Sequence, residues 1–270
     1  MGNVFIQNMS SLPHLLLTND DGIDSPFLHA LVNSLSEIAR LTVVAPAREQ
    51  SWISKAISRY REIEVHSLSR PSWYQGSHDH LRLYQAGGTP ADCVNLGLQH
   101  FCPSPPEAIV SGINIGFNAG LSFILSSGTV GGAVEGALQN KPALAFSMAL
   151  PPEAFLGLKS DPPSLSREIH KNLDCAAARA REFIPLALEE PGDQMFVHNI
   201  NFPTPTHPDT PIRETHPARL QVGGLFAEHR PGIYHFSFPG IDRSNLDPAS
   251  DTATLQEGRI SHSRLRFSLQ

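Results

Sequence analysis

The chain has 270 residues, of which 40% are hydrophobic and 17% charged, and this balance excludes a disordered chain. Acidic residues outnumber basic ones by 26 to 20, so the net charge is −6 and the basic surface of a nucleic-acid-binding protein is not expected. Three cysteines without a C-x-x-C pair predict neither a disulfide framework nor a thiolate zinc site. We therefore expect a globular, cytoplasmic protein of one or two domains with no nucleic-acid partner.

The first part of the chain predicts a βαβ unit. Residues 14–18 form a short apolar run that stops at a polar turn, as buried parallel strands do. An amphipathic helix follows from Pro26, with Ser25 as its N-cap. Residues 41–45 form a second buried strand, which ends at Pro46. Together they span about 32 residues, the length of a right-handed βαβ crossover.

The alternation of strands and helices continues to about residue 201. Further strands are predicted at residues 62–65, 81–85, 108–111, 142–146 and 196–201, and further helices at residues 90–100, 130–139 and 164–188. This order favours an α/β fold, a Rossmann-like, doubly wound and mostly parallel sheet in three α/β/α layers. After Pro203, short strand-like runs between Pro-rich and Gly-rich turns predict β-hairpins. We expect a Rossmann-like catalytic core at residues 1–203 and an accessory region of hairpins and an extended tail at residues 204–270.

One uncharged stretch, residues 108–134, has the length of a membrane span. Gly112, Gly116 and Gly120 form a G-x-x-x-G repeat in it, which is typical of packed membrane helices. The stretch is also rich in Ser, Asn and other Gly residues, and no basic residue flanks it. We therefore expect a ligand-binding loop here and no association with a membrane.

Polar residues at the end of the first strand are the first candidates for a site, because open parallel sheets bind ligands at the carboxyl ends of their strands. Asp20 and Asp21 follow this strand, and Gly22 permits the turn that would direct both carboxylates to one cation. Carboxylate, hydroxyl and amide oxygens suit a hard divalent ion such as Mg²⁺ or Mn²⁺. The alternative is that the two residues only cap a turn and the following helix.

A second candidate lies directly before the helix predicted at residues 130–139. Ser127, Gly128 and Thr129 would place N–H groups and hydroxyls at its N-terminus, which is an arrangement that binds phosphate. The alternative is an ordinary Ser/Thr cap. The sequence contains neither a P-loop pattern nor a G-x-S-x-G nucleophile elbow, and no G-x-G-x-x-G follows the first strand.

Five sequence blocks keep a common order and spacing across residues 14–148. They are L-L-L-T-N-D-D-G-I at 15–23, V-V-A-P with Q-S at 43–51, G-T-P-A-D-C-V at 88–94, V-S-G-I-N-x-G-x-N at 110–118, and S-G-T-V with E-G-A at 127–137. A later N-I-N-F-P lies at 199–203. By these blocks the chain resembles the SurE family.

The resemblance implies a metal-dependent phosphatase of nucleoside monophosphates, a 5′- or 3′-nucleotidase, that is a homodimer or homotetramer. It implies one divalent cation per subunit, Mg²⁺ or Mn²⁺, held by Asp20, Asp21, Ser51 and Asn114, with Asp20 and Asp21 also catalytic. The phosphate would contact Asn118, Ser127, Gly128 and Thr129. Residues 251–261 are similar to the family's tail motif, which places the region after residue 203 in the oligomer interface.

The sequence departs from the family pattern beside the site. Trp52 stands where a glycine normally follows the metal-binding serine, and the segment 121–126 lacks the usual acidic pair and tyrosine. The alternative function is therefore a non-catalytic nucleotide-binding or scaffold protein. A haloacid-dehalogenase-type phosphatase is disfavoured, because its D-x-D pattern would need an acid where Gly22 stands.

Overall fold

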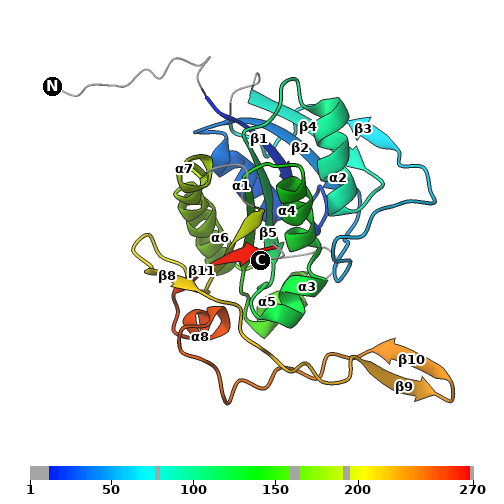
Figure 1. Cartoon of the computed structure of the whole chain (residues 1–270), viewed down its shortest axis with the longest axis vertical. Coiled ribbons are helices and arrows are strands. Elements are labelled where there is room, and N and C mark those ends of the chain that lie inside the picture. The colour runs from blue at the N-terminus through cyan, green and yellow to red at the C-terminus, as the bar shows by residue number, and fades with distance from the viewer. Residues whose placement is uncertain (1–11, 77–79, 159–164, 191–194, 268–270) are drawn as a thin grey trace.

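The computed structural model describes residues 12–76, 80–158, 165–190 and 195–267, and within them nine strands form one sheet in the order β3-β4-β2-β1-β5-β6-β7-β11-β8. The strands are β1 (His14–Thr18), β2 (Arg40–Pro46), β3 (Val65–Ser67), β4 (Leu81–Ala86), β5 (Ala108–Ile115), β6 (Ala143–Met148), β7 (Phe196–Phe202), β8 (Ile212–Thr215) and β11 (Ile260–Arg266). Figure 1 shows the sheet running through the molecule, with helices on both sides of it.

The centre of the sheet is parallel. β1 pairs in parallel with β2 on one side and with β5 on the other, and β5, β6 and β7 continue in the same direction. The strand order therefore reverses between β1 and β5, and this is the switch point of the sheet. Every residue of β1 and β6 is buried, as expected for strands covered by helices on both faces. The predicted fold class is confirmed.

Two helical layers cover the sheet. The helices α1 (Pro26–Leu35), α6 (Arg167–Ala180) and α7 (Phe183–Leu188) share one hydrophobic core with Leu15 and Leu17 of β1. The helices α2 (Pro90–Leu96) and α4 (Gly128–Leu138) share a second core with Leu16. Neighbouring residues of β1 thus face opposite layers, which is the period of a strand.

The prediction of a single helix at residues 164–188 is wrong. The structure has α6, which ends at Ala180, and α7, which begins at Phe183. Pro185 explains the break, because proline has no N–H to donate to residue 181 and its ring clashes with that carbonyl in a continuous helix. Residue 164, where the prediction began, lies outside the described residues.

Other element boundaries also differ from the prediction. The helix predicted at residues 90–100 is α-helical only to Leu96 and continues as a π-helical turn, η3 (Gly97–Phe101). The strand predicted at residues 62–65 begins only at Val65, where its pairing with Ala86 of β4 starts. Ser25 is the N-cap residue of α1, but its hydroxyl makes no capping hydrogen bond.

The region after residue 203 contributes both to the main sheet and to a separate hairpin. β11 pairs antiparallel with β7 and parallel with β8. The hairpin is formed by β9 (Phe226–Arg230) and β10 (Ile233–Phe236) and projects away from the body of the molecule (Figure 1). A short helix, α8 (Asp251–Gln256), precedes β11. The division into two domains at residue 203 stays a prediction.

The uncharged stretch at residues 108–134 is not one continuous helix. It forms β5, the short helix α3 (Leu121–Ser126) and the first half of α4, and the remaining short helix, α5 (Pro152–Leu158), follows β6. Among the described residues, no helix combines the length and the apolar composition that a membrane crossing requires.

Candidate active site

The candidate site lies at the carboxyl ends of β1 and β5, beside the switch point. Thr18, the last residue of β1, pairs with Ser111 of β5, so the residues that follow them lie at the same edge of the sheet. Asp20 and Asp21 follow β1, and Asn114 lies further along β5. The topology therefore brings these predicted metal ligands to one place.

Asp20 is buried and is held by two segments. The Thr129 hydroxyl donates a hydrogen bond to its Oδ1 atom, and the Gln50 N–H donates to its backbone carbonyl at 2.7 Å. A Cβ atom at Gly128 would lie 2.8 Å from the Cβ of Asp20, so this close approach requires glycine. Burial raises the pKa of Asp20 to about 6, although the hydrogen bond from Thr129 acts in the opposite direction.

Asp21 is held by the backbone of β5. The N–H of Ile115 donates to its Oδ2 atom at 2.9 Å, which joins the turn after β1 to the residue that follows Asn114. Burial raises the pKa of Asp21 well above its ordinary value, and the negative charge of Asp20 raises it further. The neighbouring carboxylates therefore favour either a bound proton or a bound cation.

Neither the Ser51 side chain nor the Asn114 side chain hydrogen-bonds to Asp20 or Asp21. The backbone N–H groups of their sequence neighbours, Gln50 and Ile115, make those contacts instead. The Ser51 side chain is exposed, and its hydroxyl donates to Glu49 at 2.5 Å. The amide nitrogen of Asn114 donates to the carbonyl of the residue two positions on, at 2.7 Å. Its amide oxygen is then the atom that would serve as a ligand.

Glu49 is an exposed carboxylate in the loop before Ser51, near enough for its charge to act on the two aspartates, and sequence reasoning missed it. Its negative charge contributes to the raised pKa of both Asp20 and Asp21. The available signal was its position two residues before Ser51, in the loop already assigned to the metal site.

Asn118 is fixed by residues of β6 and β7. Its N–H donates to the Asn201 side chain at 2.7 Å, and its carbonyl accepts from the side-chain amides of Asn199 and Asn201 at 2.9 and 3.3 Å. Its own amide donates to the Ser147 hydroxyl at 2.8 Å. The later N-I-N-F-P block thus positions Asn118, a role that the sequence alone did not assign.

The predicted phosphate-binding residues before α4 already have partners inside the protein. The Ser127 hydroxyl accepts from the N–H of Val130 at 3.0 Å and so caps the helix. Thr129 directs both its hydroxyl and its N–H to the Asp20 carboxylate. The N-terminus of α4 therefore stabilises a carboxylate of the chain itself, and the contact with a substrate phosphate stays a prediction.

Trp52 links the site to the hairpin. It has a left-handed φ of 59°, a conformation that suits the glycine expected from the family pattern. Its ring centroid lies 5.9 Å from that of Phe123 in α3 and 5.3 Å from that of Phe236 in β10. The segment at 121–126, which also departs from that pattern, forms α3.

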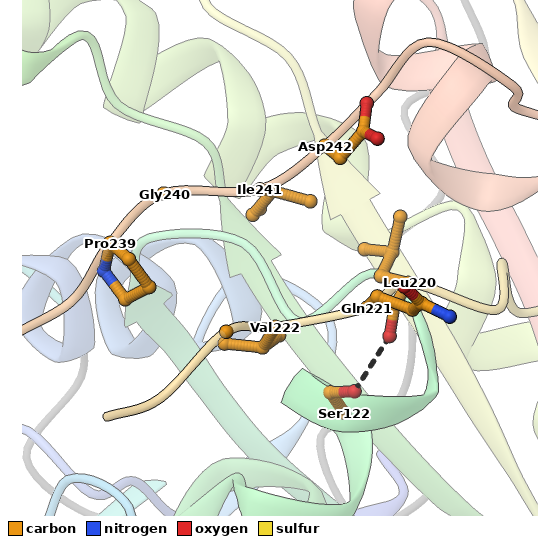
Figure 2. Close-up of a pocket in the computed structure, with 9 residues that line it drawn as sticks. Ser122, Leu220, Gln221, Val222, Pro239, Gly240, Ile241 and Asp242 are labelled. Carbon is orange, nitrogen blue, oxygen red and sulfur yellow. Dashed lines mark hydrogen bonds between the residues drawn. The ribbon is translucent and has the colours of Figure 1, made fainter. Parts of the chain in front are cut away.

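An open pocket of about 740 Å³ lies apart from the carboxylates, beside α3 and the base of the hairpin. Figure 2 shows Ser122 of α3 facing two extended segments, residues 220–223 and residues 239–242. None of the predicted site residues lines it. We therefore place the candidate active site at the strand ends, where the polar groups converge.

Comparison with known proteins supports a common ancestry over most of the chain. The family described as "Survival protein SurE" matches residues 15–223. The 5′-nucleotidase SurE of Methanosarcina barkeri is 34% identical over 257 residues, a match that covers 92% of this chain and 90% of that relative. The 5′-nucleotidase SurE of Chlorobium chlorochromatii is 39% identical over 140 residues, and there the match spans only 48% of the relative's length.

A solved structure shows the same fold. The crystal structure of the SurE protein from Aquifex aeolicus superimposes with a TM-score of 0.70 at 24% sequence identity, covering 96% of this chain and 95% of that one. The family match begins at β1 and includes the whole set of strand-end residues described above. On the extent of the family match and the identity to the Methanosarcina relative, the chain belongs to the SurE family.

Proposed function

We propose that the protein is a metal-dependent phosphomonoester hydrolase that releases phosphate from nucleoside 5′-monophosphates, and from 3′-monophosphates as well. The observation that carries this proposal is the adjacent pair of carboxylates, Asp20 and Asp21, at the switch point of the sheet. The name 5′-nucleotidase, which the relatives bear, supports the substrate class.

The donor set fits a divalent cation. Asp20 is buried and Asp21 half-buried, both have raised pKa values, and among the described residues no Lys or Arg forms an ion pair with either. We propose that one Mg²⁺ or Mn²⁺ per subunit is held by Asp20, Asp21, Ser51 and Asn114. Such an ion supplies positive charge that polarises a phosphate oxygen and orients a water molecule.

The residues of the chain supply position and proton transfer. The Ile115 N–H fixes one oxygen of Asp21, and the other oxygen accepts the proton of the attacking water. The hydroxyl and the N–H of Thr129 hold the carboxylate of Asp20. Asn118, fixed by β6 and β7, orients the phosphate of the substrate together with the backbone at Gly128.

Phosphate release from AMP and GMP, measured with a panel of divalent metals, tests this function. We expect activity with Mn²⁺ or Mg²⁺, and loss of that activity in excess EDTA. The variant Asp21→Asn should lower kcat by about a hundredfold or more, because it removes both a metal ligand and the proton acceptor. Full activity in EDTA would contradict metal dependence.

The second candidate function is non-catalytic nucleotide binding or a scaffold role. The observation that favours it is Trp52, whose bulky side chain follows Ser51 directly and packs on α3 and on the hairpin. Hydrolysis of p-nitrophenyl phosphate with Mn²⁺ separates the two functions, since a scaffold protein would show no turnover.

We also propose a cytoplasmic homodimer or homotetramer. The hairpin supports association, because two strands alone are marginally stable and Phe226 and Tyr234 expose 68% and 60% of their surface. Three free cysteines fit a reducing compartment. Sedimentation analysis tests the assembly, and a monomer at micromolar concentration would contradict it.

A further inference from the structure

The helix α8 places a buried carboxylate against the loop that carries Asn118. Asp251 is fully buried, and its Oδ2 atom accepts the N–H of Gly120 at 2.8 Å. Its Oδ1 atom accepts the N–H of Ala218 at 2.9 Å and that of Thr252 at 2.7 Å. The two oxygens of one side chain thus hold two segments that are far apart in the sequence.

These two segments also contact each other directly. The N–H of Leu121 donates to the carbonyl of Ala218 at 2.9 Å, and the Ser122 hydroxyl donates to the carbonyl of Leu220 at 3.1 Å, which is the dashed line in Figure 2. Gly120 has a φ of +83°, and a Cβ atom there would lie 2.3 Å from the Leu220 side chain. Residues 218–220 therefore lie closely along the start of α3, and Asp251 joins both.

The loop is consequently fixed at two points that lie two residues apart. Asn199 and Asn201 of β7 hold the backbone of Asn118, and Asp251 holds the backbone of Gly120. Without the second point, the loop could rotate about the first. The carboxylate is well suited to this role, because an ionised oxygen accepts several N–H groups more strongly than a neutral one does.

We propose that Asp251 is a positioning residue for the phosphate site: through Gly120 it sets the orientation of Asn118. A residue 131 positions away from Gly120 in the sequence thereby determines how tightly the phosphate of the substrate binds. This inference rests on the function proposed above. Asp251 does not touch Asp20 or Asp21 in any contact of the described residues, so it acts on the phosphate and not on the metal.

The test is steady-state kinetics of the full chain with Mn²⁺ and AMP, comparing the wild type with Asp251→Asn. The new amide places an NH₂ group against a backbone N–H, so the loop loses one of its fixed points. We expect KM to rise at least about tenfold, since a bond to a charged acceptor is replaced by an unfavourable contact. The Kd for Mn²⁺, measured by calorimetry without substrate, should stay within about twofold of the wild-type value, and amide exchange in residues 116–122 should accelerate.

A purely structural role would give a different pattern. Partial unfolding lowers the concentration of active protein, so apparent kcat falls while KM stays constant. Asn172→Ala is the matched control, because Asn172 is also buried, accepts the Thr206 N–H at 2.8 Å and lies in α6. We expect the Asn172→Ala protein to be less stable than the wild type, with an unchanged KM for AMP.

A second variant keeps the test decisive if Asp251→Asn does not fold. Ser122→Ala removes only the hydroxyl contact with residue 220, and we expect a rise in KM of about twofold to tenfold. An unchanged KM in the folded variants, or an equal rise in Asn172→Ala, overturns the positioning role. A wild type that hydrolyses no phosphomonoester overturns the proposed function itself.

Discussion

The carboxylates of Asp20 and Asp21 destabilise the metal-free fold at neutral pH. Burial raises the pKa of Asp20 from an ordinary 3.8 to about 6, so between these values the folded protein binds a proton that the unfolded chain has released. The free energy of unfolding therefore falls as pH rises through this window, and it stays reduced above pH 6. For Asp20 the effect at pH 7 is about 3 kcal/mol.

Asp20→Asn should accordingly stabilise the metal-free protein. We expect the free energy of unfolding at pH 7 to rise by about 1 to 3 kcal/mol, because the neutral amide still accepts the Thr129 hydroxyl but carries no buried charge. Urea denaturation in EDTA measures it. Asp24→Asn is the control, since Asp24 lies in the same turn but is exposed, and its stability should not change. A less stable Asp20→Asn protein would show that the charge is already compensated.

At this scale the sequence predicts the site only in part. The strand-end rule pointed to Asp20 and Asp21 from local pattern alone, and the structure places both there. The supporting residues, Asn199 and Asn201, lie 81 and 83 positions from Asn118, and no local pattern reports a contact over such a separation. The contact between Asp251 and Gly120, 131 positions apart, could not be predicted for the same reason.

At the scale of elements, local pattern predicts the central strands well. β1, α1 and β2 follow directly from apolar periodicity and a proline at the helix start. The break between α6 and α7 could also have been predicted from the sequence, because Pro185 lies inside the predicted helix. The pairing of β11 with β7 could not be predicted in this way, since it depends on which edge of the sheet is still unpaired after the other strands have assembled.

The hairpin β9–β10 is attached to the site loop through Trp52, and Trp52→Gly tests this attachment. The change relieves a left-handed φ, worth roughly 1 to 2 kcal/mol, and removes two edge-to-face ring contacts, worth roughly 0.5 to 1.5 kcal/mol each. The lost burial of the indole adds to the loss of the ring contacts, so we expect the free energy of unfolding to fall by about 1 to 3 kcal/mol.

The local effect of Trp52→Gly should be large. Amide exchange in residues 226–236 should accelerate, while exchange in β1 and β5 stays slow. Tyr60→Gly is a suitable comparison, because Tyr60 is 90% exposed and far less of its surface is packed. Unchanged exchange in the hairpin would mean that other contacts hold it.

At the scale of the whole molecule, a buried pair of histidines joins the region after residue 203 to the core. Nδ1 of His198 in β7 lies 2.9 Å from Nε2 of His262 in β11, and the two rings stack. Burial lowers the pKa of both, that of His198 to about 3. Glu190, Glu214 and Arg264 are the charged groups around the pair.

The pair should make the fold sensitive to acid. Above pH 6.5 both histidines are neutral whether the chain is folded or not, so their contribution is constant. Between pH 6.5 and about 3 the unfolded chain binds protons that the folded protein excludes, and the free energy of unfolding falls as pH decreases, by up to about 1.4 kcal/mol per pH unit and proton. Urea denaturation at several pH values measures this slope.

His262→Gln should make that slope shallower between pH 6.5 and 4.5. The unfolded variant lacks one of the two histidines that bind a proton only after unfolding. His170→Gln, which replaces an exposed histidine of α6, should leave the slope as it is in the wild type. Comparing the variants with each other cancels the opposite contribution of Asp20. Equal slopes in all three proteins would argue against a neutral buried pair.

The position of β11 has a bearing on how the protein is made. This strand lies between β7 and β8 in the sheet, although it is the last of the three to leave the ribosome. Until residues 260–266 have been synthesised, β7 has an unpaired edge and β8 has no partner, and such an edge invites strands from other nascent chains. A messenger truncated before codon 260 should therefore yield inclusion bodies rather than a shortened folded protein.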